Sequence, residues 1–340
     1  MKKFFKVLLF FLLIFFLIFT FNEWHYHQNL KKIASSDERI FPFKIESKEL
    51  PSKIAENLQN NGFIVSKKTF LRFVKRQKIA HKLQAGKFFL SKNLTIPTIT
   101  QKLLKAESEM IKITFPEGFT KEEIDARLAR IGLINKGDFL ACLQEKCDFK
   151  IFDFLPQEKG QIKREKLEGF FFPDTFFIDP LKFNLENFTY QMLINFQNRI
   201  NTFTSDIKLS KRSLEEIIIM ASIIEEETRT AAERPQVADI FWKRLDHNIP
   251  LGADATVRYF TGNKKGAITV SQLQEDNPYN TRLHAGLTPT AICNPGLASI
   301  KAAIFPQKND YWYFLHDKKG QIHFAKTLQE HNKNKEQFLY

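Results

Sequence analysis

The sequence predicts an α+β protein preceded by a transmembrane helix, and three patterns support this prediction. The chain begins with an apolar run long enough to span a membrane. A strand–helix pattern then occurs twice, around Ile54 and again around Ile124. Farther along, a helix of almost only apolar residues ends in three consecutive glutamates. With 340 residues and 43% hydrophobic content, the chain can also bury a sizeable core.

The N-terminal apolar run extends from Phe4 to Trp24 and contains a single lysine. About 20 apolar residues suffice for a helix to cross the hydrocarbon core. Lysines at the start of the run place the N-terminus in the cytoplasm and everything after Trp24 outside it. Residues 1–24 are therefore predicted to be a cytoplasmic tip and anchor, followed by a linker at 25–40. A cleavable signal peptide is the alternative, but no small-residue cleavage site follows the run.

The net charge of +13 would suggest nucleic-acid binding in a cytosolic protein. Because the predicted topology places the basic residues outside the cytoplasm, we expect anionic lipid head groups and envelope carboxylates as partners, and no nucleic acid. The most basic stretch runs from Lys67 to Lys87. It is predicted to be the solvated face of a helix that turns Phe70, Phe73 and Val74 inward.

An internal duplication follows the linker. Residues 54–64 and 124–134 share the same spacing of apolar residues, and each segment is predicted to be an amphipathic helix closed by a glycine, Gly62 or Gly132. A short strand, Phe41–Ile45 or Ile111–Phe115, precedes each helix. The pattern predicts one α+β module at 41–108 and a related copy at 109–180, within a larger domain at 109–340.

The most informative segment is a helix predicted from Ser213 to Thr228. Ser213 and Glu216 form a capping box at its start, and the apolar residues 217–224 predict burial on all sides. Successive side chains diverge by about 100°, so the three glutamates that follow cannot all face solvent. Glu225 continues the stripe of Leu214, Ile218 and Ala221, and we predict that it points inward.

An inward carboxyl late in a helix favours its protonated form, as a general acid for glycosidic cleavage requires. The alternative is that the glutamates form a solvated helix end paired with Arg229 or Arg234. No cofactor or metal is expected, since neither the cysteines nor His323 and His331 have the spacing of metal ligands. The sequence allows a Cys142–Cys147 disulfide but does not determine it.

Several motifs occur in one order, and together they resemble the YceG-like (MltG-type) endolytic murein transglycosylases over about residues 41 to 340. The matching motifs are Leu167-Glu168-Gly169-Phe170, Ala221 to Thr228, Glu233-Arg234-Pro235, Asp254-Ala255-Thr256, Tyr279-Asn280-Thr281 and Asn294-Pro295-Gly296. The chain departs from the family pattern at Phe176, at Ala255 where a proline is common, and at residues 287–291. These departures affect the expected shape of the substrate groove and leave Glu225 untouched.

The resemblance implies that Glu225 is the catalytic residue of an inner-membrane lyase. It implies cleavage of the MurNAc–GlcNAc β-1,4 bond in nascent glycan strands, with 1,6-anhydro ends that stop strand elongation. It also implies that the first module is LysM-like, that the rest is a YceG-like catalytic domain, and that wall synthases are partners.

The expected groove residues are Glu168, Asp254, Tyr279, Asn280 and Thr281, although caps and turns use the same residue types. Two other functions stay open from sequence: a non-catalytic scaffold of wall synthesis, and a hydrolytic muramidase that uses the same glutamate. Finally, residues 311–315 and 321–325 are predicted to form a hairpin around Asp317 to Gly320.

Overall fold

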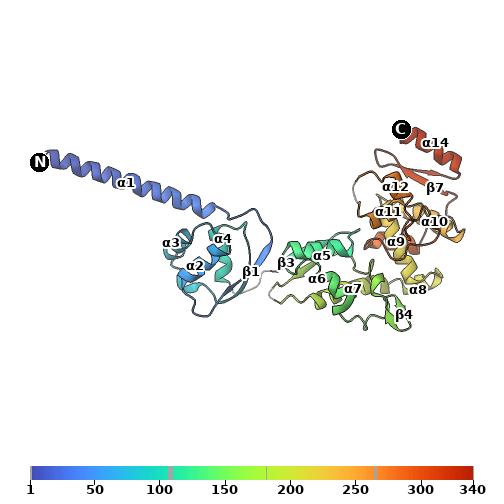
Figure 1. Ribbon diagram of the computed structural model, residues 1–340, viewed down its shortest axis with the longest axis horizontal. Helices are drawn as coiled ribbons and strands as arrows, with labels where there is room; N and C mark the ends of the chain where they lie inside the picture. Colours follow the sequence, from blue (N-terminus) through green and yellow to red (C-terminus); the bar gives the residue numbers. More distant parts are fainter. Residues whose placement is uncertain (1, 106–109, 181, 264–265, 340) are drawn as a thin grey trace. The chain divides into compact units, whose positions relative to one another are not determined.

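The computed structural model describes residues 2–105, 110–180, 182–263 and 266–339 (Figure 1). The chain divides into two compact units that each contain more than one segment. Unit 1 comprises Met1–Ile111, Leu128–Asn135 and Phe177–Phe183. Unit 2 comprises Lys112–Arg127, Lys136–Phe176 and Asn184–Tyr340. The predicted domain boundaries after residues 24, 40 and 108 stay predictions.

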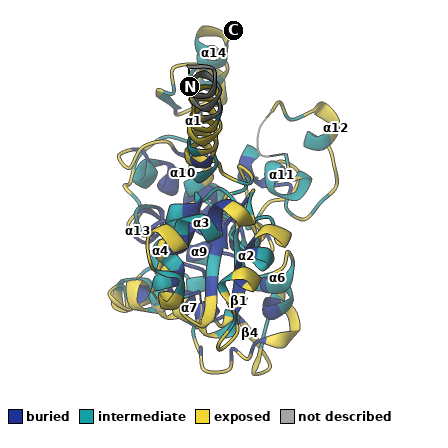
Figure 2. Ribbon diagram, turned by 90° about the vertical axis from the view of Figure 1, so that its left-hand side faces the viewer, coloured by how far each residue is buried: buried dark blue, intermediate teal, exposed yellow. Residues whose placement is uncertain are grey.

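Unit 1 begins with the 30-residue helix α1, Lys2–Lys31. Within the described part of the chain, no helix combines the length and the apolar character needed to cross a membrane. The side chains of residues 1–8 and 11, part of the predicted anchor, lie outside the described residues. The predicted membrane helix is therefore not confirmed. Most large apolar side chains from Leu9 to Trp24 are more than half exposed, and Figure 2 shows α1 largely in the colour of exposed residues.

The C-terminal part of α1 is attached to helix α3, Lys67–Arg76. Glu23 accepts hydrogen bonds from Arg72 and from Arg76, whose Nη2 lies 2.7 Å from Glu23 Oε1. The same two guanidinium groups lie 4.5 and 4.9 Å from the ring centre of the buried Tyr26. An ion pair and cation–π contacts therefore hold the end of α1 against the folded part of unit 1.

A β-α-α-β arrangement forms the core of unit 1. Its elements are β1 (Ile40–Ile45), α2 (Pro51–Asn60), α3, the short η1 (Ala80–Lys82) and β2 (Gly86–Ser91), followed by α4 (Ile96–Leu104). The strands pair antiparallel, with Phe43 opposite Phe88. Helix α3 buries Phe70 and Val74 and packs Phe73 against the same core, which confirms the predicted solvated basic face.

Most of the second strand–helix segment belongs to unit 2 and forms its first part. Strand β3 (Ile111–Phe115) pairs with the later strand β6 (Asp174–Ile178) in a two-stranded sheet. Between them lie α5 (Lys121–Arg130), α6 (Asp138–Ala141), η2 (Cys142–Lys146), β4 (Gln157–Glu158), β5 (Gln161–Ile162) and η3 (Arg164–Lys166). Gly62 and Gly132 follow α2 and α5 with φ of 71° and 82°, so both adopt the left-handed conformation predicted for a closing glycine.

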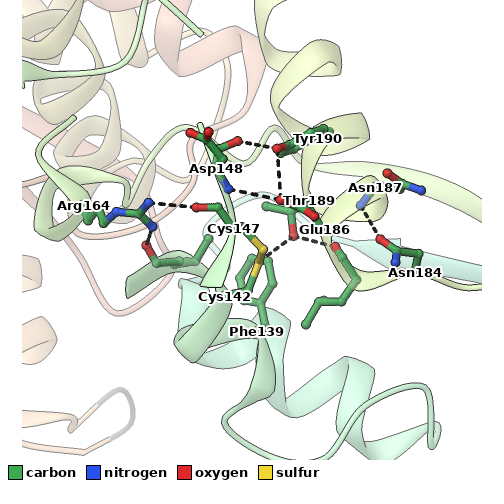
Figure 3. The surroundings of a disulfide bond; sticks show 12 residues. Phe139, Cys142, Cys147, Asp148, Arg164, Asn184, Glu186, Asn187, Thr189 and Tyr190 are labelled. Atoms are coloured by element: carbon green, nitrogen blue, oxygen red, sulfur yellow. Dashed lines mark hydrogen bonds between the residues drawn. A yellow bond between two sulfur atoms is a disulfide. The ribbon is translucent and has the colours of Figure 1, made fainter. Parts of the chain in front are cut away.

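A disulfide joins Cys142 to Cys147 across η2 (Figure 3). The Arg164 guanidinium donates hydrogen bonds to the carbonyl oxygens of Leu143 and Cys147, at 3.0 and 2.8 Å. The next residue, Asp148, donates its backbone N–H to Glu186 on helix α7 (Leu185–Asn201). The sequence allowed this disulfide, and the structure contains it.

The rest of unit 2 packs around helix α9, Leu214–Glu227. Helices α10 (Arg234–Asp246), α11 (Asp254–Thr261) and α13 (Leu297–Ile304) contact α9, and residues 217–224 are all buried. The Ser213–Glu216 capping box is present, so the predicted start, burial and end of this helix are confirmed. The remaining helices are α8 (Thr204–Leu209), α12 (Val270–Leu273) and α14 (Leu328–Phe338).

The predicted C-terminal hairpin is confirmed. Strands β7 (Tyr313–His316) and β8 (Ile322–Ala325) pair antiparallel, with Phe314 opposite Phe324. The first strand begins two residues later than predicted and the second one residue later. Gly320 adopts a φ of 86° in the connecting loop, where the sequence predicted a turn glycine.

Replacing Cys142 and Cys147 together by serine is expected to lower the free energy of unfolding of unit 2 by about 2 kcal/mol, because the bond closes a short loop in the unfolded chain. Chemical denaturation of the full-length chain measures this change. A reducing agent should lower the wild-type transition to that of the double variant and leave the variant unchanged. A wild-type denaturation transition that does not shift in the reducing agent would contradict the prediction.

Candidate active site

The buried helix α9 ends in three consecutive glutamates, whose side chains point in three directions. Glu226 is exposed, whereas Glu225 and Glu227 are largely covered. Thr228 ends the helix, and both its backbone N–H and its hydroxyl donate to the carbonyl oxygen of Ile224. The predicted divergence of the three side chains is therefore present, and Glu225 is one of the two that turn inward.

Both carboxylate oxygens of Glu225 accept hydrogen bonds from the protein. Oε1 accepts from Nη2 of Arg234 at 3.0 Å, and Oε2 accepts from the backbone N–H of Gly296 at 2.9 Å. The Glu225 side chain is 8% exposed and that of Arg234 is 12% exposed. Glu225 is thus inward, as predicted, and also paired with Arg234, the partner that the alternative interpretation named. Two donors from different elements fix its orientation.

Arg234 is the first residue of helix α10 and has donors to spare. Its Nε is buried and has no hydrogen-bond partner among the described residues. An unsatisfied buried N–H costs about 1 to 3 kcal/mol. A catalytic role and a bound water or ion are among the reasons for which such a donor is retained in native proteins.

A turn between β3 and α5 carries Glu117, whose carboxyl lies near the Glu225–Arg234 ion pair. Gly118 donates its N–H to the carbonyl oxygen of Asn294 at 3.0 Å, and Asn294 donates its N–H to the carbonyl oxygen of Phe119 at 2.8 Å. These two bonds hold the turn against Gly296. Glu117 lies directly over Gly296, where an added Cβ would come within 1.9 Å of Glu117 Oε1. A side chain at position 296 would therefore displace the Glu117 carboxyl.

Burial and the negative charge of Glu225 raise the pKa of Glu117, while Arg234 opposes that rise. The pKa of Glu117 thus responds to both charges of the Glu225–Arg234 ion pair. Glu226 lies on the other side of the same turn, where an added Cβ on Gly118 would come within 2.7 Å of its Oε1.

The side chain of Asn294 holds together the segments that surround Glu117 and Gly296. Its Oδ1 accepts from the backbone N–H groups of Gly169 and Phe171, at 3.1 and 2.9 Å. Its Nδ2 donates to the carbonyl oxygen of Phe119 at 2.8 Å and to Glu168 Oε1 at 2.9 Å. One amide therefore connects three segments that are far apart in the sequence.

Glu168 was expected to line the groove, and the structure places it in the interior. Its side chain is 0% exposed and accepts the backbone N–H of Lys121 at 3.1 Å as well as the Asn294 amide. Burial, with a contribution from the charge of Glu122, raises the pKa of Glu168 to about 8. In this structure Glu168 supports the turn next to Glu225.

Glu227 occupies a separate environment on the opposite side of α9. Its Oε1 accepts the backbone N–H of Ala255 at 2.9 Å. Burial and the charge of Asp254 raise the pKa of Glu227 to about 7, although the Ala255 N–H opposes the rise. Ala255 is a position where the sequence departs from the family pattern. A proline there would have no N–H to donate.

Two of the remaining candidates are accessible. Asp254 is about half exposed and forms an ion pair with Arg282, whose Nε lies 2.8 Å from Asp254 Oδ1. Tyr279 is partly exposed, shares a hydrogen bond with the Thr290 hydroxyl at 2.9 Å, and lies with its ring centre 5.2 Å from that of Tyr259. Burial raises the pKa of both tyrosines.

Asn280 and Thr281 are buried and hold loops together. Asn280 Nδ2 donates to the carbonyl oxygens of Leu273 and Glu275, at 3.0 and 2.9 Å. The Thr281 hydroxyl accepts the backbone N–H of Ala253 at 3.1 Å. These contacts are the turn-forming role that the sequence offered as the alternative to sugar binding.

Sequence reasoning missed Glu117 and the backbone of Gly296 as parts of the site. Both stand in recognisable motifs, the turn at 116–118 and Asn294-Pro295-Gly296. A turn and a loop glycine have ordinary structural explanations, so neither motif by itself points to the carboxyl on α9.

Comparison with known proteins identifies the class to which this fold and site belong. Residues 43–337 match the YceG-like family, and the chain belongs to that family. It is 33% identical over 323 residues to the endolytic murein transglycosylase of Bacillus subtilis (strain 168), covering 91% of this chain and 88% of that protein.

Two further relatives agree with this placement. The endolytic murein transglycosylase of Streptococcus pneumoniae serotype 2 is 25% identical over 311 residues, which cover 83% of this chain and 55% of that protein. A 2.6 Å crystal structure of a yceG-like protein from Listeria monocytogenes aligns with a TM-score of 0.57 at 28% identity. That alignment covers 87% of this chain and 99% of the Listeria chain, and it supports the predicted mixed α+β fold.

The contribution of Glu227 to the stability of the folded protein is expected to fall as the pH rises from about 4.5 to about 7, because Glu227 holds its proton in the folded state and loses it in the unfolded chain over that range. Glu227→Gln keeps the acceptor for Ala255 and cannot ionise. It should therefore reduce the pH dependence, with a larger stabilisation at pH 8 than at pH 5. Chemical denaturation of wild type and variant at both pH values measures the effect, and equal pH dependence in the two proteins would contradict it.

Proposed function

We propose that this protein is an endolytic lytic transglycosylase that cleaves the MurNAc–GlcNAc β-1,4 bond within nascent glycan strands, with Glu225 as its catalytic carboxyl. The membership of the YceG-like family and the names of its relatives support the reaction class. The observation that carries the assignment is the position of Glu225. It lies at the end of a buried helix, with its carboxylate held between Arg234 and the Gly296 N–H.

The proposed reaction suits a site of this kind. Hydrolytic glycosidases activate a water molecule or form a covalent intermediate, generally with two carboxylates. In a lytic transglycosylase the 6-hydroxyl of N-acetylmuramic acid attacks its own anomeric carbon, which yields a 1,6-anhydro end. Because the nucleophile is already tethered, its effective concentration is high and the site needs only to hold the ring and transfer protons. The fixed orientation of Glu225 meets that requirement.

Two other functions are tested by the same experiments. A scaffold of the wall-synthesis machinery would bind glycan strands without cleaving them. A muramidase would use Glu225 to activate water, and its products would end in reducing sugars. Products with anhydro ends are one water lighter, so mass spectrometry of digested, uncrosslinked strands separates all three functions.

Glu225→Gln is expected to lower strand cleavage by about 10²- to 10⁴-fold, because glutamine cannot transfer a proton. Its amide can accept with only one atom, so either Arg234 or the Gly296 N–H loses its acceptor. We therefore expect an accompanying loss of roughly 1 to 3 kcal/mol in stability. Mass spectrometry of digested strands and thermal melting of the full-length chain measure the two effects.

Glu226→Gln and Glu227→Gln are the matched controls, because each makes the same chemical change on the same turn of α9. Both should cleave strands at rates close to wild type. The assignment fails if Glu225→Gln cleaves normally, or if only the Glu227 variant is inactive. Loss of folding in Glu225→Gln would show a structural residue instead.

We also propose that the first 24 residues anchor the protein in the inner membrane, with unit 2 and the rest of unit 1 outside the cytoplasm. The exposed apolar side chains of α1 support this placement, since water solvates such a surface poorly. The Cys142–Cys147 disulfide fits an oxidising compartment. In that position the β-α-α-β core of unit 1 would be a LysM-like module that grips glycan, and wall synthases would be neighbours.

Replacing Leu13 and Phe16 by arginine is expected to release the protein from membranes, because each charge at the centre of a spanning helix costs about 2.5 to 3.5 kcal/mol. Gln28→Arg, outside the apolar run, should have no effect. Alkaline extraction of membranes followed by immunoblotting measures retention, and crosslinking before extraction tests for bound synthases. Full retention of the double variant would contradict the anchor, and crosslinked complexes without any synthase would contradict the partnership.

A further inference from the structure

Proton transfer to the glycosidic oxygen and proton removal from the attacking hydroxyl need not involve the same group. Both oxygens of Glu225 accept hydrogen bonds, so this carboxyl is held as an acceptor and not as a donor. A second carboxyl beside Glu225 would be better suited to donate a proton if it accepted fewer hydrogen bonds. Glu117 and Glu227 are the two carboxyls whose surroundings must be compared.

Glu117 meets these conditions more closely than Glu227. It lies over Gly296, the residue whose N–H binds Glu225, and it shares the influence of Arg234. It is also exposed, so a sugar oxygen can reach it. Glu227 is covered, accepts the N–H of Ala255 and diverges from Glu225 by about 200° around the helix.

The backbone around Glu117 gives it a fixed position. Two hydrogen bonds join its turn to the Asn294–Gly296 loop, and the Asn294 amide holds that loop to the segment after Glu168. The groups that act on Glu117 are Glu225 on α9 and Arg234 on α10, while Glu226 lies on the other side of the turn. Partial burial and the Glu225 charge both raise the pKa of Glu117, which favours its protonated form, while Arg234 opposes the rise.

We propose that Glu117 is the group that protonates the glycosidic oxygen and that Glu225 takes the proton from the attacking hydroxyl. This inference rests on the proposed function. The Glu117 O–H bond breaks as the bond between the anomeric carbon and the glycosidic oxygen breaks, and that oxygen leaves as a hydroxyl. The 6-oxygen bonds to the anomeric carbon and gives its proton to Glu225. Solvent then returns one proton from Glu225 to Glu117, so no net charge is gained or lost.

The test compares two substrates with the full-length chain. One is an uncrosslinked glycan strand, whose leaving group needs a proton. The other is a murein tetrasaccharide with 4-nitrophenolate as its leaving group, which departs without one. Glu117→Gln should lower cleavage of strands by about 10²- to 10⁴-fold and lower cleavage of the nitrophenyl substrate by less than roughly tenfold. Glu225→Gln should be impaired on both substrates.

Glu226→Gln is the matched control, because it removes a charge from the other side of the same turn, and it should behave as wild type on both substrates. Glu117→Gln with near-normal strand cleavage, or with equal losses on the two substrates, overturns the inference and leaves the proposed function intact. Normal strand cleavage by Glu225→Gln overturns the proposed function itself. If melting shows that Glu117→Gln does not fold, Glu117→Ala, which also lacks the acid, replaces it, and the same difference between substrates is required.

Discussion

The side-chain amide of Asn294 is the interaction on which the candidate site depends. It satisfies two backbone N–H groups near Gly169, one carbonyl oxygen in the 116–119 turn, and the buried carboxyl of Glu168. An isosteric change to aspartate would replace the amide donor by an acceptor facing Glu168. Because buried polar groups are costly when unpaired, all three segments depend on this single residue keeping both its donor and its acceptor. The loop that it fixes carries Gly296, which orients Glu225.

Burial of α9 supplies the other half of the site. Residues 217–224 are enclosed by neighbouring helices, so a rotation of the helix would disrupt its packing against them. Its end therefore presents Glu225 to Arg234 and Gly296, and Glu227 to Ala255. Two carboxyls separated by one residue consequently have different surroundings. Glu225 is held by an ion pair, whereas Glu227 is buried with one backbone donor, which is why burial dominates the pKa of Glu227.

Local patterns were sufficient for much of the fold. The capping box at Ser213, the buried run after it, the closing glycines and the C-terminal hairpin all follow from interactions between residues close in sequence, and the structure confirms them. The same reasoning identified Glu225 as inward. It misjudged the surroundings of Glu168, because a carboxyl that is completely buried against backbone donors has the same local sequence as one that lines a groove.

The sequence by itself determined the capping box and buried run of α9, the closing glycines, the presence of the C-terminal hairpin, and the motifs that carry the family resemblance. These features depend on periodicity, capping and apolar patterning within short segments. Only the tertiary structure decided that Glu117, Arg234 and Gly296 meet Glu225. The contact between Glu225 and Gly296, for example, joins residues 71 positions apart. No local pattern encodes such a contact, because its geometry arises from how α9, α10 and two loops pack around a shared core.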